Sequence, residues 1–413
     1  MKIIHITYSN FIGGASIAAN RIHNSLLKRN IQSLMWVNEP DSEQDILQQN
    51  LKNNKFYKKI RRYLTWPLLL TLKTKIPIHH SISILPSNWI EQINRSDADI
   101  INLHWVQREM ISIKDISRIN KPIVWTLHDM WAFCGAEHYT PDLRWREGYT
   151  PYNRPSYEFG FDINYWTWKR KKKYWKKPLQ IITPSKWLAK CVNNSALMNS
   201  WPVNVIPNPI NTKLFTPIKK EFARLNLGIS KESKLIIFGA DGGVGDERKG
   251  FDLLIKSLIF LKKNFSTINF ELIIFGQKKP KFIQKVNFNI KYFGFVKDQD
   301  KLSLIYNAAD LMAIPSRQDN LPNTSLEAHS CGTPIVSFSI GGLPDLVKHK
   351  KTGFLAKAFN TKDFANGIAW VLKNNINGKL SKNARAQIVK NFSEKIISQK
   401  YIHIYKKVLH STN

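Results

Sequence analysis

Hydrophobic residues in the first part of the chain form short runs that are separated by polar stretches. Residues 2–8 are one such run, Gly13 and Gly14 follow it, and residues 15–27 have the spacing of a helix. Residues 31–37 form a second apolar run, so the chain opens with a strand, a tight turn, a helix and another strand. Because parallel strands need a crossover connection, this order predicts a parallel sheet.

The same alternation continues and then starts again after the middle of the chain. Further strands are expected at 99–103, 123–127, 179–183, 203–206, 234–238, 270–275, 291–293, 311–314 and 335–338, and further helices from residue 185 and at 250–262, 299–308, 361–374 and 381–410. Between the two series, Pro207-Asn208-Pro209-Ile210-Asn211 has the composition of a linker. The pattern therefore predicts two separate doubly wound α/β domains.

Residues 130–165 follow neither the helical nor the strand period. They are rich in Trp, Tyr, Pro and Gly. This composition predicts a long irregular loop, and loops of that length are usually functional or mobile.

Length and composition agree with a globular protein of two domains. The chain has 413 residues, of which 43% are hydrophobic and 12% aromatic, and single cores rarely grow beyond about 250–300 residues. The longest apolar run, near residues 66–72, is far below the roughly 20 residues of a membrane span. Because the chain enters a strand at once, we expect no signal peptide. Cys134, Cys191 and Cys331 lack metal-binding spacing, which fits a reducing cytosol.

The charge predicts an anionic partner. Lys and Arg outnumber Asp and Glu by 62 to 30, a formal net charge of +32. Basic runs at 52–62 and 169–177 also contain Tyr and Trp, which suits an anionic membrane surface. Single-stranded nucleic acid is an alternative partner for such runs, and solvated helix surfaces are a third reading.

Two carboxylates stand out in the stretch from Pro315 to Asp345. Asp319 and Glu327 are eight residues apart, on a loop and a short helix that follow the strand at 311–314. Asn323 or Thr324 is expected to cap that helix. This strand-to-helix crevice is where open α/β sheets bind ligands. The two acids fit a glycosidase-like acid and base pair, a clamp on sugar or ribose hydroxyls, or, for Glu327, an ordinary helix surface.

Three further places carry candidate chemistry. Gly13 and Gly14 let backbone amides approach a phosphate, but the third glycine of a dinucleotide fingerprint is missing. The glycine-rich segment 239–250 ends in Arg248 and Lys249, which suit a diphosphate, although it is not a Walker A loop. His128 follows a strand end, where active sites of parallel sheets form. The alternatives are a structural turn at Gly13 and Gly14, a flexible loop at 239–250 and a structural role for His128.

Taken together, these ordered motifs resemble the retaining, nucleotide-sugar-dependent glycosyltransferases of the GT-B fold, called glycosyl transferases group 1. The motifs are Asp319 to Glu327 followed by Ala-x-x-Cys-Gly-Thr-Pro-Ile-Val, Gly-Gly-Leu-Pro-Asp at 341–345, Lys-Thr-Gly-Phe-Leu at 351–355, Arg-Lys-Gly-Phe at 248–251 and Ile-Pro-Asn-Pro-Ile-Asn at 206–211. In the first half, Gly-Gly-Ala-Ser at 13–16 and Trp-Thr-Leu-His-Asp-Met-Trp at 125–131 resemble the subgroup that builds exopolysaccharide, capsule or O-antigen.

The resemblance implies an α/β architecture of two Rossmann-like domains that face a central cleft. The acceptor-side domain would occupy 1–207 and the nucleotide-sugar-binding domain 208–385. A C-terminal helix at 386–413 would pack back towards the first domain.

The resemblance also implies roles for the matching positions. Glu327 would bind the ribose hydroxyls, Asp319 would hold the donor sugar, and His128 would face sugar and acceptor. The remaining donor-binding positions would be Gly13, Gly14, Arg248, Lys249, Phe295, Val296, Asn320, Leu321, Pro322 and Thr324. Such enzymes need no metal or other cofactor, because cations and helix N-termini stabilise the leaving diphosphate. The proton of the acceptor would go to a donor phosphate oxygen.

Three departures from the family pattern concern the site. Asp319 stands where the family has glutamate, and His329-Ser330 replaces smaller residues or methionine before Cys331. The loop after His128 has lost most of the cysteines often found there. This loop is expected to shape the acceptor site.

The sequence therefore predicts a cytoplasmic glycosyltransferase at the inner face of the membrane. It would move a sugar from a nucleotide-diphosphate sugar to a glycan or polyprenyl-diphosphate-linked acceptor in bacterial surface polysaccharide synthesis. A basic nucleic-acid-binding protein is one alternative, which leaves the ordered motifs unexplained. Another GT-B enzyme, such as a nucleotide-sugar 2-epimerase or a phosphorylase, is a second alternative.

Overall fold

The computed structural model describes residues 1–10, 13–39, 60–61, 63–230, 232–239, 243, 245–277, 279 and 286–411. The chain divides into two compact units. Unit 1 contains Met1–Pro207 and Ile397–Asn413, and unit 2 contains Asn208–Ile396. Most of the predicted basic run at 52–62 lies outside the described residues.

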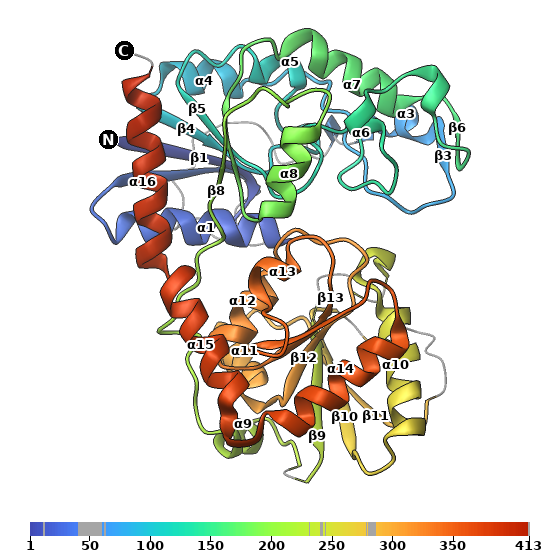
Figure 1. Cartoon of the computed structure of the whole chain (residues 1–413). Helices are drawn as coiled ribbons and strands as arrows, with labels where there is room; N and C mark the ends of the chain where they lie inside the picture. The colour runs from blue at the N-terminus through green and yellow to red at the C-terminus, as the bar shows by residue number, and fades with distance from the viewer. Residues whose placement is uncertain are drawn as a thin grey trace. The chain divides into compact units, whose positions relative to one another are not determined.

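Unit 1 is built on a parallel sheet that has six strands in the described part of the chain, in the order β2-β1-β4-β5-β7-β8. These strands are β1 (Lys2–Ser9), β2 (Gln32–Glu39), β4 (Ile100–Leu103), β5 (Ile123–Thr126), β7 (Gln180–Thr183) and β8 (Val203–Val205). The helices are α1 (Gly13–Leu27), α3 (Trp66–Leu70), α4 (Trp89–Arg95), α5 (Ile113–Ile116), α6 (Arg144–Glu147), α7 (Ile163–Tyr174) and α8 (Lys186–Asn194). An antiparallel pair, β3 (Leu72–Thr74) and β6 (Glu158–Gly160), completes the unit (Figure 1).

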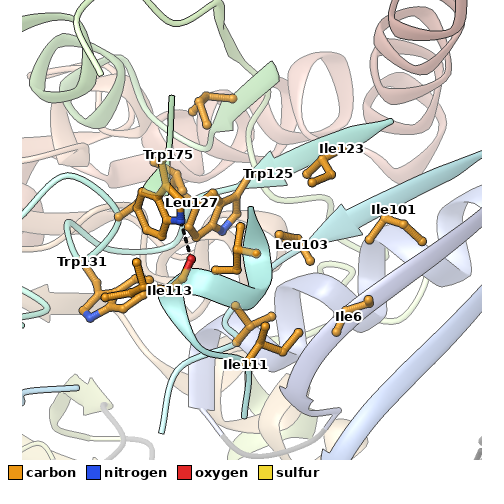
Figure 2. Close-up of a cluster of buried hydrophobic side chains, with 14 of the residues drawn as sticks. Ile6, Ile101, Leu103, Ile111, Ile113, Ile123, Trp125, Leu127, Trp131 and Trp175 are labelled. Atoms are coloured by element: carbon orange, nitrogen blue, oxygen red, sulfur yellow. Dashed lines mark hydrogen bonds between the residues drawn. The ribbon is translucent and has the colours of Figure 1, made fainter. Parts of the chain in front are cut away.

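Alternation along β1 places apolar side chains on both faces of this sheet. Ile4 and Ile6 belong to the larger core cluster, whereas Ile3 packs with residues of α1 and of the C-terminal helix. Figure 2 shows part of the larger cluster, in which Trp125, Trp131 and Trp175 lie together. The Trp175 indole donates to the Ile113 carbonyl over 2.8 Å, so even this apolar core satisfies its polar atoms.

Unit 2 repeats the design with a second parallel sheet, of six strands among the described residues, in the order β11-β10-β9-β12-β13-β14. The strands are β9 (Lys234–Gly239), β10 (Phe270–Phe275), β11 (Asn289–Gly294), β12 (Leu311–Ile314), β13 (Ile335–Phe338) and β14 (Gly353–Ala356). The helices are α9 (Lys220–Asn226), α10 (Phe251–Asn264), α11 (Gln299–Ala308), α12 (Asn323–Ser330), α13 (Leu343–Leu346), α14 (Thr361–Asn374) and α15 (Lys379–Asn391). The predicted pair of doubly wound α/β domains is confirmed, and each predicted strand is present with its ends within two residues.

The predicted helix at 381–410 is two helices. α15 ends at Asn391 and α16 runs from Glu394 to His410. Phe392, between them, is buried, and its carbonyl accepts from the Ile210 amide over 3.0 Å. From Ile397 onwards, α16 packs on the sheet of unit 1 through Tyr401 and Tyr405.

Residues 130–165 are mostly irregular, as predicted, but they contain short regular elements and much of the segment is buried. The segment contains α6 and β6, and Trp131, Phe133 and Cys134 are fully buried. Lys171 of α7 holds this segment from inside, because its ammonium donates to the carbonyls of Trp131, Cys134 and Gly135. Burial lowers the pKa of Lys171 to about 7. Lys171, one lysine of the basic run at 169–177, is therefore a buried structural residue and not part of the surface.

Candidate functional site

An ion pair lies at the carboxyl end of β12, where the predicted site was placed. The Lys249 ammonium donates to Asp319 Oδ2 over 2.7 Å, and Arg248 Nη1 is 3.8 Å from the same oxygen. Arg248 and Lys249 close the 3-10 turn Glu247–Lys249 just before α10, whereas Asp319 is on the loop after β12. The fold therefore brings together the predicted cations and the first predicted acid.

Asp319 remains ionised although it is only 5% exposed. Burial alone would raise the pKa of its carboxyl, but Lys249 and Arg248 lower the pKa below its ordinary value. Ser316 Oγ donates to Oδ2 over 3.2 Å, and the Asn320 amide donates to Oδ1 over 3.1 Å. The carboxylate is thus a fixed negative centre that orients the Lys249 ammonium, whereas the Arg248 guanidinium donates to Asp246 over 2.8 Å and to the Gln318 carbonyl over 3.0 Å.

Two glycines allow the backbone to close tightly around this centre. A β-carbon on Gly341 would lie 1.9 Å from the Asp319 carbonyl oxygen, and one on Gly250 would lie 2.0 Å from the Pro315 carbonyl oxygen. Both have positive φ, +55° and +69°, a conformation that favours glycine. The Gly341-Gly342 and Lys249-Gly250 motifs therefore have a direct steric role in shaping the site.

Glu327 lies inside α12, whose residues are all buried except Thr324. The Tyr306 hydroxyl, from α11, donates to Glu327 Oε2 over 2.6 Å. The expected side-chain cap by Asn323 or Thr324 is wrong: Pro322 is at the N-cap, and no side chain caps the helix. Asn323 instead accepts a hydrogen bond from Asn208 over 3.2 Å. The first amides of α12 are therefore left without a capping side chain.

The other predicted donor positions of unit 2 differ in how far they are buried. Asn320 and Leu321 are buried, and Pro322 and Thr324 are partly buried at the start of α12. Val296 packs against the core, whereas Phe295, just after β11, is 58% exposed. The assignment of Phe295 to the donor stays a prediction.

Arg317 is a member of this region that the motif did not reveal. Its guanidinium donates to both carboxylate oxygens of Asp252 over 2.7 Å and to the Glu247 carbonyl over 2.7 Å. The Arg317 amide also donates to the Arg248 carbonyl over 2.7 Å. These bonds tie the loop after β12 to the segment that carries Arg248 and Lys249. A sequence motif gives no signal for these bonds, because the partners of Arg317 are about 70 residues away in sequence.

In unit 1, His128 and Asp129 follow the end of β5, as the sequence predicts. Asp129 is a hub: Oδ2 accepts from the Trp105 indole over 2.9 Å and from His138 Nδ1 over 2.6 Å, and Oδ1 accepts from the Trp131 amide over 3.0 Å. Burial raises the pKa of Asp129, but His138 and these hydrogen bonds lower it below the ordinary value. Asp129 therefore fixes the backbone that presents His128.

His138 and Ser81 extend this hub. His138 Nε2 lies 2.9 Å from Ser81 Oγ, so the order serine, histidine, aspartate matches that of acyl-transfer triads. Ser81 and His138 are both buried, however, and the His79 and Trp105 rings lie tilted against the His138 ring, with centroids 4.6 Å and 5.2 Å from it. We assign the three residues to the support of the His128 segment.

Gly13 and Gly14 begin α1, two residues earlier than the predicted helix start. Gly13 has φ +81°, and a β-carbon there would meet no atom within 4 Å among the described residues. Glycine is therefore needed for its backbone conformation. Among the described residues, no group of three or more His, Cys, Asp or Glu side chains is arranged to hold a metal ion.

Comparison with known families decides what kind of protein the two units form. The family model described as "Glycosyltransferase Family 4" matches residues 12–214, and the model described as "Glycosyl transferases group 1" matches residues 219–391. The two matches together run over nearly the whole chain. The chain belongs to the GT-B glycosyltransferases.

Known glycosyltransferases are similar to this one at low sequence identity. An uncharacterized glycosyltransferase of Methanocaldococcus jannaschii is 28% identical over 240 residues, which cover 55% of this chain and 60% of that protein. The chain spans between 39% and 60% of the length of the first curated relatives that it matches.

Two solved structures have the same fold as this chain. The Anabaena protein HepE, solved in complex with UDP-glucose, has a TM-score of 0.63 and 16% identity, with 98% of this chain and 100% of that chain covered. WaaG, a glycosyltransferase involved in lipopolysaccharide biosynthesis, has a TM-score of 0.63 and 17% identity, with 98% and 99% covered. At these identities the likeness concerns the fold of the glycosyltransferase and not its substrate.

Proposed function

We infer that this glycosyltransferase moves a sugar from a nucleotide-diphosphate sugar to a hydroxyl group of a glycan acceptor, with retention of configuration. The acceptor we assign is lipid-linked, and the pathway is the synthesis of a bacterial surface polysaccharide. The motifs at 13–16 and 125–131 support that pathway.

The observation that carries the proposal is the placement of Arg248 and Lys249 on buried Asp319. A lysine ammonium has three N–H donors, and Asp319 accepts one of them at 2.7 Å. The ammonium therefore stays fixed in direction while further donors face the substrate. Arg248 and the first amides of α12 add donors in the same unit. Such a group stabilises the nucleoside diphosphate as it leaves, which is the main catalytic task in sugar transfer.

Glu327 and Asp319 are proposed to orient the donor and not to act as nucleophile and base. The Tyr306 hydroxyl directs one oxygen of Glu327, and the other accepts the ribose hydroxyls. Asp319 is committed to Lys249, Ser316 and the Asn320 amide, so it holds the sugar through this network. The proton of the acceptor hydroxyl goes to a donor phosphate oxygen, and no metal or other cofactor is assigned.

An anionic membrane is the proposed partner of unit 1. Six large apolar side chains, which we call the α3 patch, are each at least 46% exposed: Tyr63, Leu64, Trp66, Leu70, Phe159 and Phe161. α3 packs against the same small cluster as Trp166 of α7, which brings the patch next to the basic run at 169–177. Lys75 lies over the Phe159 ring at 5.6 Å. Aromatic residues beside lysines are the composition of a membrane-surface site.

Peripheral contact of this kind requires no spanning segment. Among the described residues, none of the helices has the length and apolar character needed to cross a bilayer. We therefore propose that the protein works at the inner face of the membrane, where the anionic leaflet attracts its net charge of +32.

A transfer assay tests the proposed activity. The protein is incubated with a panel of UDP-, GDP- and ADP-sugars, with bacterial membranes as the acceptor source, and lipid-extracted products are analysed by mass spectrometry. We expect one donor to yield a glycan longer by one sugar only when membranes are present. A sugar that changes without any acceptor would identify an epimerase instead, and no reaction and no nucleotide binding across the panel would overturn the proposal.

A further inference from the structure

Arg317 contacts both ends of the turn that carries Lys249. From the loop after β12, its Nη1 donates to the Glu247 carbonyl over 2.7 Å, at the start of that turn. Nη1 and Nη2 also donate to the two carboxylate oxygens of Asp252, over 2.7 Å each, in the first turn of α10. The Arg317 amide donates to the Arg248 carbonyl over 2.7 Å, between these two contacts. One residue of a distant loop therefore holds this turn at both ends and in the middle.

The same loop also holds the tip of the Lys249 side chain. Two residues after Arg317, Asp319 accepts a hydrogen bond from the Lys249 ammonium over 2.7 Å. Two residues before Arg317, the Pro315 carbonyl oxygen would lie 2.0 Å from a β-carbon on Gly250, so the two backbones approach as closely as a glycine permits. The backbone around Lys249 and the ammonium at the end of its side chain are thus both fixed by one loop.

The ion pair of Asp252 and Arg317 is better suited to fixing geometry than to adding stability. The two side chains are 48% and 37% exposed, and ion pairs of such exposure contribute little to the free energy of unfolding. Their contact is nonetheless bidentate, which orients a planar guanidinium strictly. Because three donated hydrogen bonds commit Arg317 to Glu247 and Asp252, it is placed to hold the turn and not to bind a substrate itself.

We propose that Arg317 and Asp252 are positioning residues for the diphosphate of the donor. They keep the turn in the place from which the Lys249 ammonium reaches both Asp319 and the diphosphate. A lysine side chain loses rotamer entropy when it is ordered, and a side chain that is ordered in advance does not lose it again on binding. The pair therefore strengthens diphosphate binding through Lys249 without touching the ligand. This inference rests on the proposed function, in which Lys249 binds the diphosphate.

Asp252→Asn distinguishes positioning from long-range charge by the sign of its effect. The substitution removes a negative charge near an anion site, which through the electric field alone would strengthen the binding of a nucleoside diphosphate. It also leaves the guanidinium only one oxygen to bind, so positioning predicts weaker binding. We expect titration calorimetry with UDP, GDP and ADP to give an affinity about three- to tenfold lower for the nucleotide that binds. Unchanged or higher affinity would overturn the inference.

Arg317→Met and Arg317→Lys test the same contact from its other side. Lys keeps the charge but lacks the planar fork that binds both oxygens of Asp252. Both variants should bind the nucleoside diphosphate about three- to tenfold more weakly, whereas binding of the matching nucleoside, which has no phosphate, should not change. Arg95→Met is the control, because it breaks another exposed ion pair, with Glu91 over 2.7 Å, and should change neither affinity. Wild-type diphosphate affinity in both Arg317 variants, or an equal loss of nucleoside affinity, would contradict the inference.

The double variant Lys249→Met with Arg317→Met shows whether Arg317 acts through Lys249. If it does, Arg317→Met has no further effect once Lys249 is replaced. A further loss of about three- to tenfold would mean that Arg317 binds the ligand directly, and would overturn the inference. The single variant Lys249→Met tests the proposed function separately. Weaker binding in Lys249→Met together with wild-type binding in Arg317→Met would overturn only this inference, whereas wild-type binding in Lys249→Met would overturn the diphosphate site itself.

Discussion

Lys249 and Asp319 form a buried ion pair with 2.7 Å between ammonium nitrogen and carboxylate oxygen. Seventy residues of chain separate them, and each belongs to a different motif of the family pattern. The pair links the cationic segment before α10 to the loop after β12. It also explains how a shorter acid can serve at this position. Asp319 is held by four neighbouring groups and does not need the reach of a glutamate to meet Lys249.

Gly341→Ala tests the tight backbone around this pair. The added β-carbon would lie 1.9 Å from the Asp319 carbonyl oxygen, so the loop must move. The matched control is Gly378→Ala, since Gly378 also has positive φ (+66°) but nothing within 4 Å. We expect the control to lose about 1–2 kcal/mol of stability from backbone strain alone, and Gly341→Ala to lose more and also bind nucleoside diphosphates more weakly. Equal stability and binding in the two variants would show that the contact is unimportant.

Glu327→Gln tests the proposed clamp on the ribose. Gln keeps the size of the side chain and can still accept from Tyr306, but the charge is lost. Hydrogen bonds to a charged group contribute about 1.5–3 kcal/mol, so calorimetry should give about 10- to 100-fold weaker binding of the nucleoside diphosphate. Tyr306→Phe, which removes the 2.6 Å hydrogen bond, should weaken it less. Unchanged affinity in Glu327→Gln would refute the ribose role.

His329→Met tests the departure from the family pattern inside α12. His329 is fully buried, and burial lowers its pKa to about 3. At a pH below the ordinary histidine pKa of about 6.5, His329 therefore binds a proton in the unfolded chain but not in the folded protein. Between the two pKa values, His329 lowers the free energy of unfolding by up to about 1.4 kcal/mol for each pH unit of acidification. At a pH above the ordinary pKa it has no such effect. In His329→Met, the stability of unit 2 should fall less between pH 6.5 and pH 4.

Hydrogen exchange of α12 amides measures this stability locally, so unfolding of unit 1 does not obscure it. His403→Met is the control, because His403 is exposed on α16. The same acid dependence in His329→Met and in the wild-type protein would mean that His329 is protonated in the folded state.

Trp66→Ser combined with Leu70→Ser tests the α3 patch. We expect the wild-type protein to float with vesicles of phosphatidylcholine and phosphatidylglycerol, and the double variant to remain largely in the soluble fraction, because the apolar contact is lost. Phe222→Ser combined with Leu225→Ser removes similarly exposed side chains from α9 in unit 2 and should float as the wild-type protein does. The wild-type protein should float less with vesicles of pure phosphatidylcholine. Equal flotation of both double variants would show that the α3 patch is not the membrane-binding surface.

The architecture was predictable because the strands of both sheets are short, strongly apolar runs. Ile3 to Ile6 and Leu235 to Phe238 carry this signal without ambiguity, and nearly all of them are fully buried. Residues 130–165 gave no periodic signal, although Trp131 and Phe133 are core residues. Their segment is held by the carbonyl contacts of Lys171 and not by a regular element, and periodicity cannot reveal such a brace. The break at Phe392 was missed for a similar reason, since helical spacing continues on both sides.

The site was predictable as a set of residue types and not as a network. Asp319, Glu327, Arg248, Lys249 and His128 could be named from motif order. Their partners could not, because Tyr306 and Arg317 have no motif, and a hydrogen bond between distant positions depends on the register of the folded sheets. The structure brings Asp319, Arg248 and Lys249 together, but the roles of all the named residues towards a donor, including those of Phe295, Gly13 and Gly14, stay predictions.

The most direct test of the donor site measures the binding of UDP, GDP and ADP to Lys249→Met by titration calorimetry. Lys263→Met, which removes an exposed lysine of α10, is the matched control. Because Lys249→Met takes the nearest cation away from buried Asp319, the double variant Lys249→Met with Asp319→Asn removes both charges together. We predict that the wild-type protein and Lys263→Met bind one nucleoside diphosphate equally well. Both variants without Lys249 should bind it about 10- to 100-fold more weakly. Wild-type affinity in the folded double variant would contradict the assignment of Lys249 to the diphosphate.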